Sequence, residues 1–239
     1  MERNRIKDAA QTGDALYGLH LTFPCPQLIE MLASQHLDFL YLDGEHGAFD
    51  LRTVEGCCRA ADLVGLIPIA RVPDLFPATI NRFLDRGLRG VIGPHVATRA
   101  DAEHLVEACY FSPLGRRSWG DSRGEGYGIA IPDMSKRMAE INEGISVGAM
   151  IEEKAGLDNL GDILEVPGID YFNFGMQDLA QSLGHPGQPS HPAVRAAVAE
   201  ASDRIHAAGK RLREDFMVFA WVRDVLHEGL RALVSEKAR

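Results

Sequence analysis

The chain has no apolar run that approaches the roughly 20 residues needed to cross a bilayer. Its first residues, MERNRIKDAAQTGD, are charged and precede no apolar segment of the kind that a signal peptide needs. Cysteine is scarce, and none of the four cysteines has the CxxC spacing of a zinc or redox site. We therefore expect a cytoplasmic protein with reduced thiols and no membrane partner.

The chain also has no excess of positive charge. The 239 residues include 25 Lys and Arg against 34 Asp and Glu, which gives a formal charge of −9. No segment interleaves basic with aromatic residues, and a surface this negative repels phosphate backbones. Nucleic acid is therefore excluded as an expected partner, whereas a local basic pocket for a small anion remains open.

Short β-branched runs alternate with longer segments of helical period, a pattern typical of a parallel sheet wrapped by helices. The pattern predicts strands at 16–23, 38–43, 66–72, 90–96, 146–152 and 170–175, a weaker one near 210–216 and a last one at 230–234. It predicts helices near 26–36, 51–64, 77–87, 99–110, 156–166, 192–208 and 217–228. With no linker or repeat, residues 1–239 are predicted to form one (β/α)8 TIM-barrel domain whose last helix is missing or truncated.

Local chemistry supports several of these boundaries. Thr98 is placed to cap the helix that starts after it, with Asp101 in the first turn. Four glycines stand where predicted helices should stop: Gly65, Gly87, Gly209 and Gly229. Residues 112–131 form a long Gly- and Arg-rich loop, and a loop of that length is usually functional or disordered.

Ionisable residues gather at the predicted carboxyl ends of the strands, where barrel enzymes carry their active sites. Those that follow or end strands two to six are Asp43, Glu45, His46, Arg71, His95, Glu152, Glu153 and Asp178. Glu152 and Asp178 lie at or just past the ends of neighbouring predicted strands, and two adjacent carboxylates repel unless a cation or a shared proton lies between them. Oxygen ligands suit a hard divalent ion, although either residue would also serve as an ordinary helix cap.

His46 and Arg71 are candidates for the chemistry itself. His46 follows two acidic residues, and an imidazole oriented by a carboxylate is a suitable base near neutral pH. Arg71 offers a fixed fork of donors for a carboxylate or an enolate oxygen. A structural salt bridge is the plainer alternative for the arginine, and simple solvation is the plainer one for the histidine.

These motifs resemble the HpcH/HpaI aldolase/citrate lyase family, in particular its class II pyruvate-dependent aldolases. The matching segments are YLDGEHGAFDLRTVE (41–55), PIARVPD (68–74), FLDRGLRGVI (83–92), SPLGRR (112–117), IEEKAGLDNLGDILEVPGID (151–170) and DLAQSLGHPGQPSHPAV (178–194). In-order matches run from about residue 15 to about residue 210, which is more than three quarters of the chain.

The resemblance implies that Glu152 and Asp178 bind a divalent metal, Mg²⁺, Mn²⁺ or Co²⁺. It also implies that His46 is the acid/base residue, that Asp43 orients it, and that Glu45 lies near the metal-bound waters. The expected reaction is the reversible cleavage of a 4-hydroxy-2-oxo acid to pyruvate, or hydroxypyruvate, and an aldehyde, through an enolate that the metal stabilises.

By the same resemblance, Arg71 contacts the carbonyl and enolate oxygen, and Asp85 reaches the site of a neighbouring subunit in a homo-oligomer. The backbone around Gly175, Met176 and Gln177 is expected to bind the pyruvate carboxylate. Met176 and Gln177 differ from the usual family residues, which leaves the substrate open. Two alternatives stay open as well: a CoA-thioester lyase of the malyl- or citramalyl-CoA type, and a barrel that binds an anion without turnover.

Overall fold

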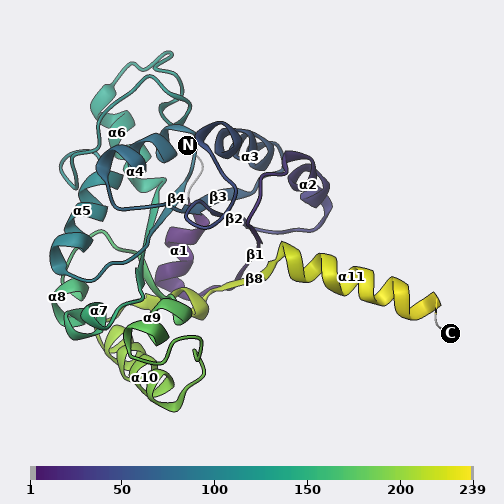
Figure 1. Ribbon diagram of the computed structural model, residues 1–239. Helices are drawn as coiled ribbons and strands as arrows, with labels where there is room; N and C mark the ends of the chain where they lie inside the picture. Colours follow the sequence, from purple (N-terminus) through teal and green to yellow (C-terminus); the bar gives the residue numbers. More distant parts are fainter. Residues whose placement is uncertain (1–3, 238–239) are drawn as a thin grey trace.

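The protein forms a curled sheet of eight parallel strands covered by helices (Figure 1). The computed structural model describes residues 4–237. The strands are β1 (Leu16–Leu21), β2 (Phe39–Asp43), β3 (Ile67–Arg71), β4 (Gly90–Gly93), β5 (Ser146–Ile151), β6 (Tyr171–Phe174), β7 (Arg211–Leu212) and β8 (Met217–Trp221). Their order is β7-β6-β5-β4-β3-β2-β1-β8, which confirms the predicted α/β fold of the TIM-barrel type, here as a half-barrel.

The helices lie mainly on the outer side of the sheet (Figure 1). They are α1 (Arg5–Thr12), α2 (Pro26–Met31), α3 (Leu51–Leu63), α4 (Pro77–Asp85), α5 (Arg99–Cys109), α6 (Met134–Glu143), α7 (Lys154–Asp158), α8 (Leu160–Leu164), α9 (Met176–Ser182), α10 (Pro192–Ala207) and α11 (Val222–Lys237). Short 3-10 turns complete the set: η1 (Leu32–Ser34), η2 (Arg123–Glu125) and η3 (Arg213–Asp215).

The strands bury both faces, so the core has two parts. Leu40 and Leu42 of β2 face the outer part beneath the helices, whereas Phe39 and Tyr41 face the inside of the curl, as the two-residue period of a strand requires. Space inside is tight, because a Cβ at Gly18 would lie 2.5 Å from the Phe39 ring. This packed interior fixes the strand ends that carry the site.

The last part of the chain differs from the prediction. The predicted helix at 217–228 and strand at 230–234 are wrong, because β8 occupies Met217–Trp221 and α11 occupies Val222–Lys237. The final helix is therefore present, and only η3 stands between β7 and β8, where a barrel normally has a helix. Leu226, Leu230 and Leu233 recur at helical spacing, and Gly229 lies inside α11 rather than at a helix end.

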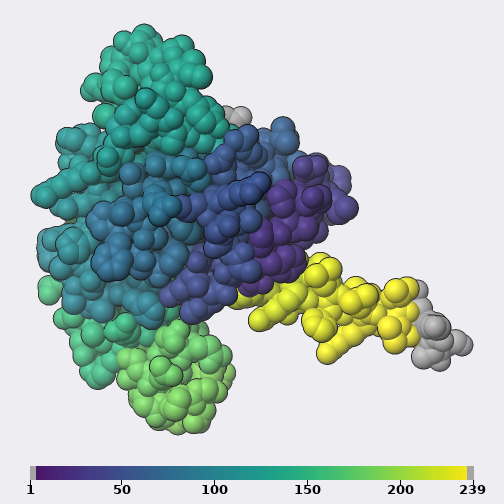
Figure 2. Space-filling view, turned by 45° about the horizontal axis from the view of Figure 1, so that its top comes forward, coloured from purple at the N-terminus to yellow at the C-terminus, as the bar shows by residue number. Residues whose placement is uncertain are grey.

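Helix α11 extends away from the body of the protein (Figures 1 and 2). Val222 at its start is buried, whereas five later apolar side chains are exposed by 48–67%: Val225, Leu226, Leu230, Leu233 and Val234. On the neighbouring strands, Tyr17 of β1 and Val218 of β8 are also about half exposed. No helix within residues 4–237 is both long enough and apolar enough to span a membrane.

Several predicted helix boundaries are confirmed. Thr98 accepts a hydrogen bond from the amide of Asp101, whose carboxylate in turn accepts one from the amide of Thr98, so the pair forms a capping box. Gly65, Gly87 and Gly209 have φ values of 71° to 103°, the left-handed conformation in which a helix commonly ends. These caps fix where the loops at the strand ends begin.

Candidate active site

Asp43 and Arg71 end neighbouring strands and lie opposite each other in the β2–β3 ladder. Arg71 donates from Nε and Nη2 to both carboxylate oxygens of Asp43, at 2.8–3.1 Å. Burial alone would raise the pKa of Asp43, but the hydrogen bonds and charge of Arg71 outweigh it and lower that pKa. Asp43 is therefore a buried, ionised partner that fixes the guanidinium plane.

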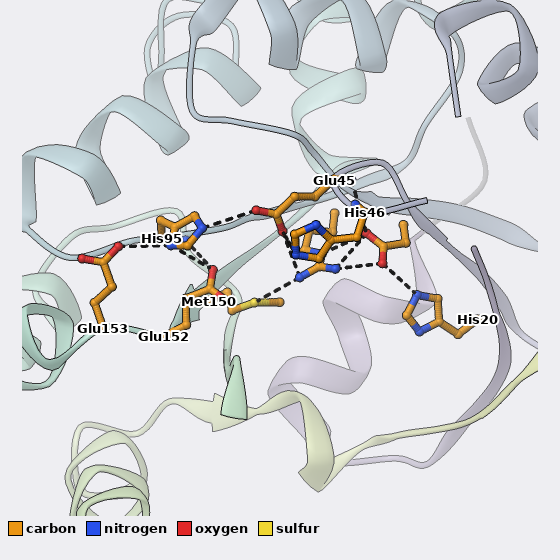
Figure 3. A network of polar contacts seen from close by, with 9 residues as sticks. His20, Glu45, His46, His95, Met150, Glu152 and Glu153 are labelled. Atoms are coloured by element: carbon orange, nitrogen blue, oxygen red, sulfur yellow. Dashed lines mark hydrogen bonds and ion pairs between the residues drawn. The ribbon is translucent and has the colours of Figure 1, made fainter. Parts of the chain in front are cut away.

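The other edge of the Arg71 guanidinium faces Glu45 and Met150. Its Nη1 lies 2.9 Å from Glu45 Oε2 and 4.0 Å from Met150 Sδ (Figure 3). Arg71 thus stands between two carboxylates at the mouth of the half-barrel, with its side chain only 12% exposed. The arrangement forms a compact charged centre at the carboxyl ends of β2, β3 and β5.

His46 lies at the edge of this centre. Its backbone amide donates to Asp43 Oδ1 at 3.1 Å, whereas its ring Nε2 lies 3.9 Å from Glu45 Oε2. Asp43 and His46 thus meet through the backbone, and the orientation of the ring by Asp43 stays a prediction. The ring is 65% exposed and accessible to a substrate.

A second histidine, His20 of β1, lies below Asp43. Its Nε2 is 4.0 Å from Asp43 Oδ2, its ring stacks on Tyr41 with centroids 4.2 Å apart, and it meets the Trp221 ring at a tilt of 39° with centroids 3.8 Å apart. Burial lowers the pKa of His20 to about 4, so its ring is neutral at ordinary pH. Sequence reasoning missed this residue, although the alternation in LYGLHL already placed it on the inward face.

His95 connects the two sides of the site. It follows β4, and its backbone amide donates to Glu152 Oε1 at 2.8 Å. Its ring Nε2 lies 3.4 Å from Glu45 Oε1, and its Nδ1 lies 3.1 Å from Glu153 Oε1 and 3.6 Å from Glu152 Oε1 (Figure 3). The sequence placed His95 at the fourth strand end but gave it no role.

Glu152, directly after β5, is 1% exposed, and burial raises its pKa. Its Oε2 lies so close to the chain at Gly175 that a Cβ there would be 2.1 Å away, which explains the glycine. Asp178 stands in the first turn of α9, three residues after Gly175. Within residues 4–237, Glu152 Oε1 lies 3.6 Å from His95 Nδ1 and forms no ion pair with a lysine or arginine, so a cation would supply the countercharge that this buried carboxylate lacks.

These oxygens fit a hard divalent ion by their chemistry. In the part of the chain that the structure describes, however, no three His, Cys, Asp or Glu side chains are grouped closely enough to hold a metal by themselves. Water and substrate oxygens would have to complete a shell begun by Glu152 and Asp178. An open shell of this kind is what a catalytic rather than a structural metal needs.

The remaining predicted residues lie outside the Arg71 network. Asp85 ends α4 and lies 3.4 Å from Arg117 Nη2, in contact with the loop that follows α5. Gly175 caps α9, Met176 packs partly against the core and Gln177 is exposed. Gly175, directly before α9, lies against the Glu152 side chain.

Comparisons with known proteins agree on one family. The sequence profile of the HpcH/HpaI aldolase/citrate lyase family matches residues 16–229. A hydroxypyruvate/pyruvate aldolase of Pseudomonas aeruginosa is 35% identical over 211 residues, which cover 87% of this chain and 76% of that protein. A 4-hydroxy-2-oxovalerate aldolase of Rhodococcus jostii (strain RHA1) is 34% identical over 211 residues, covering 87% and 79%.

A solved structure shows the same fold. It is that of an HpcH/HpaI aldolase/citrate lyase family protein from Burkholderia cenocepacia J2315, which superposes with a TM-score of 0.88 at 28% identity. The match covers 99% of this chain and 100% of that one. The similarity therefore includes β7, β8 and the segments on either side of them.

Proposed function

Because the chain belongs to the HpcH/HpaI aldolase/citrate lyase family, we propose that it is a divalent-metal-dependent aldolase. The proposed reaction is the reversible cleavage of 4-hydroxy-2-oxo acids to pyruvate or hydroxypyruvate and an aldehyde. The observation that carries the proposal is the position of Arg71 between Asp43 and Glu45, on a site that also contains the buried Glu152. The relatives named as pyruvate-type aldolases support the substrate class.

Glu152 and Asp178 would hold the metal, Mg²⁺, Mn²⁺ or Co²⁺. When bound, such an ion acts as a Lewis acid on the oxygens of a 2-oxo acid. The buried position of Glu152 strengthens its attraction for a cation, because little water screens the charge. The amides of Met176 and Gln177 would donate to the carboxylate of the acid, since the first N–H groups of a helix lack partners within it, whereas the Gly175 amide already donates to the carbonyl of Ile151 at 3.2 Å.

Arg71 would stabilise the charge that develops on the enolate oxygen. Its guanidinium is already fixed by two contacts with Asp43, so little reorganisation is needed when the charge appears. A donor of this kind contributes about 3–4 kcal/mol to the stabilisation of an oxyanionic transition state.

His46 would move the proton. In the cleavage direction a base must accept the proton of the 4-hydroxyl group before the bond between C3 and C4 breaks. His46 is the exposed imidazole at this rim, and Glu45 near its ring can orient it. In the synthesis direction, the same ring returns the proton to the new hydroxyl group.

The test is a screen of purified protein with pyruvate or hydroxypyruvate and a set of aldehydes, after EDTA treatment and re-addition of Mg²⁺, Mn²⁺ or Co²⁺. We expect activity only with metal, and we expect Glu152→Gln to lose both activity and Mn²⁺ binding. Malyl-CoA, assayed in parallel, separates the CoA-lyase alternative. Full activity after EDTA, or turnover of malyl-CoA alone, would contradict the proposal.

A further inference from the structure

The N–H groups of Arg71 that could meet a substrate are already engaged. Its Nε and Nη2 are bonded to Asp43, and its Nη1 faces Glu45 Oε2 at 2.9 Å and Met150 Sδ at 4.0 Å. An incoming enolate oxygen therefore finds the guanidinium occupied by two carboxylates. One of the two carboxylates must be displaced from the guanidinium if Arg71 is to bind the enolate oxygen as proposed above.

Glu45 is the carboxylate that can be displaced from Arg71. Asp43 is held by Arg71 and by the backbone amides of Glu45 and His46, and it is 2% exposed. Glu45 Oε2 is buried and lacks a well-aligned hydrogen bond, although it is close enough to Arg71 for an ion pair. The Glu45–Arg71 interaction therefore consists of charge attraction without a well-aligned hydrogen bond. It is weaker than the Asp43–Arg71 interaction, which has both.

His95 offers the displaced carboxylate a second partner. Glu45 Oε1 already lies 3.4 Å from His95 Nε2, so Glu45 stands between the imidazole and the guanidinium (Figure 3). The opposite edge of the His95 ring is held by Glu153, 3.1 Å from Nδ1. A small rotation of Glu45 can thus exchange one partner for the other without exposing its charge.

We propose that Glu45 occupies Nη1 of Arg71 while the site is empty and moves onto His95 when a substrate oxygen takes its place. His95 is then a positioning residue that acts through Glu45. The inference rests on the proposed function, because it needs a 2-oxo acid at Arg71. Without His95, a largely buried carboxylate would lose its ion pair on leaving Arg71, and substrate binding would weaken.

Oxalate, an unreactive mimic of the pyruvate enolate, is the probe. Its affinity is measured by titration calorimetry at saturating Mn²⁺, after Mn²⁺ binding to each variant has been measured alone by electron paramagnetic resonance. His95→Asn is the test variant, because His95 has φ 51° and asparagine tolerates that conformation. His36→Asn is the matched control, since His36 has φ 52° and lies on an exposed loop.

We expect His95→Asn to weaken oxalate binding by roughly tenfold, or about 1.4 kcal/mol, because Glu45 then has no imidazole beside it when it leaves Arg71. We expect His36→Asn to leave it unchanged. Glu45→Gln should tighten oxalate binding, because an amide competes less well for Arg71. In that background, the further change His95→Asn should have no effect, since no charge remains to be received.

Three results would overturn the inference while leaving the proposed function intact. They are unchanged oxalate affinity in His95→Asn, an equal loss with and without Glu45→Gln, and no gain from Glu45→Gln. If the wild-type protein with bound Mn²⁺ fails to bind oxalate or pyruvate at all, the proposed function itself is contradicted, and this inference with it.

Discussion

Arg117 and Glu125 form an ion pair inside the loop after α5, with side chains that are 1% and 0% exposed. Arg117 also lies 3.3 Å from Asn81 Oδ1 and stacks over the Phe111 ring at 4.9 Å. Residues 112–131, expected to be functional or disordered, are therefore anchored to α4 and to the end of α5.

Breaking this pair should cost stability. In Glu125→Gln, Arg117 keeps its charge and retains only Asp85, 3.4 Å away, as an acidic partner, and the loss of one member of a buried pair typically costs about 3–5 kcal/mol. Urea unfolding followed by circular dichroism measures the change. The control is Glu103→Gln, which removes an exposed partner of Arg99 at 2.8 Å and should cost less than about 1 kcal/mol. Equal effects of the two substitutions would contradict the role given to Arg117.

Arg71→Lys should keep a positive charge at the site but lose the fork that fits Asp43 and an enolate oxygen together. We expect kcat/KM for aldol cleavage to fall about 10² to 10³-fold, while Mn²⁺ binding is retained. Steady-state kinetics with a fold check by circular dichroism measures this. Arg59→Lys is the control, since Arg59 also holds a carboxylate through two nitrogens, 3.2 and 2.6 Å from Glu55. Unchanged kinetics in Arg71→Lys would remove Arg71 from the oxyanion role.

His20 should make the fold sensitive to mild acid. Its pKa in the folded protein is about 4, against 6.5 for a histidine in water, so the unfolded chain takes up the proton first. The stability tied to neutral His20 is fully present above pH 6.5 and is lost as the pH falls towards 4. The loss is on the order of 3 kcal/mol.

His20→Phe keeps an aromatic ring on Tyr41 and Trp221 but has no titrating group. The free energy of unfolding of this variant should therefore stay flatter than that of the wild type between pH 6.5 and 4. Parallel curves for the two proteins, from urea unfolding at several pH values, would show that His20 is not the group responsible.

The exposed leucines of α11 should drive self-association. A helix that extends from the body with an apolar stripe exposes surface that water disfavours, so we propose a homo-oligomer held in part by this stripe. Leu226→Gln with Leu230→Gln should lower the mass measured by light scattering after gel filtration. Leu63→Gln is the control, because Leu63 is 79% exposed on α3, away from that helix. A monomeric wild type would contradict the proposal.

The sequence predicted the first six strands because each is a short apolar run between turn residues. FLYLD, for example, ends at Asp43 as predicted, and IPIAR ends at Arg71, one residue before the predicted end of that strand. The last strand was not predicted at its true position, because MVFAW runs directly into α11 with no glycine or proline between them. Local pattern alone cannot tell such a strand from the start of a helix; its pairing with β1 decides it.

For the site, the sequence predicted which residues lie at one rim of the sheet, but not which of their side chains pair with each other. Spacing placed Asp43, Arg71 and Glu152 at one rim, because parallel strands end on the same side. It could not show that Asp43 would pair with Arg71, or that the His46 ring would face Glu45. Nor could it give His95 its three acidic neighbours, because these contacts depend on the left-handed turn at that residue.

The short connection at η3 leaves the sheet with two edges, β7 and β8, where a closed barrel has none. On the side away from β1, the main chain of Met217–Trp221 has no ladder partner within residues 4–237. Amide hydrogens there should exchange with deuterium sooner than those of β3 or β4, which are paired on both sides. The same edge offers an extended segment of another chain a place to add as a strand, next to the helix that already reaches outward.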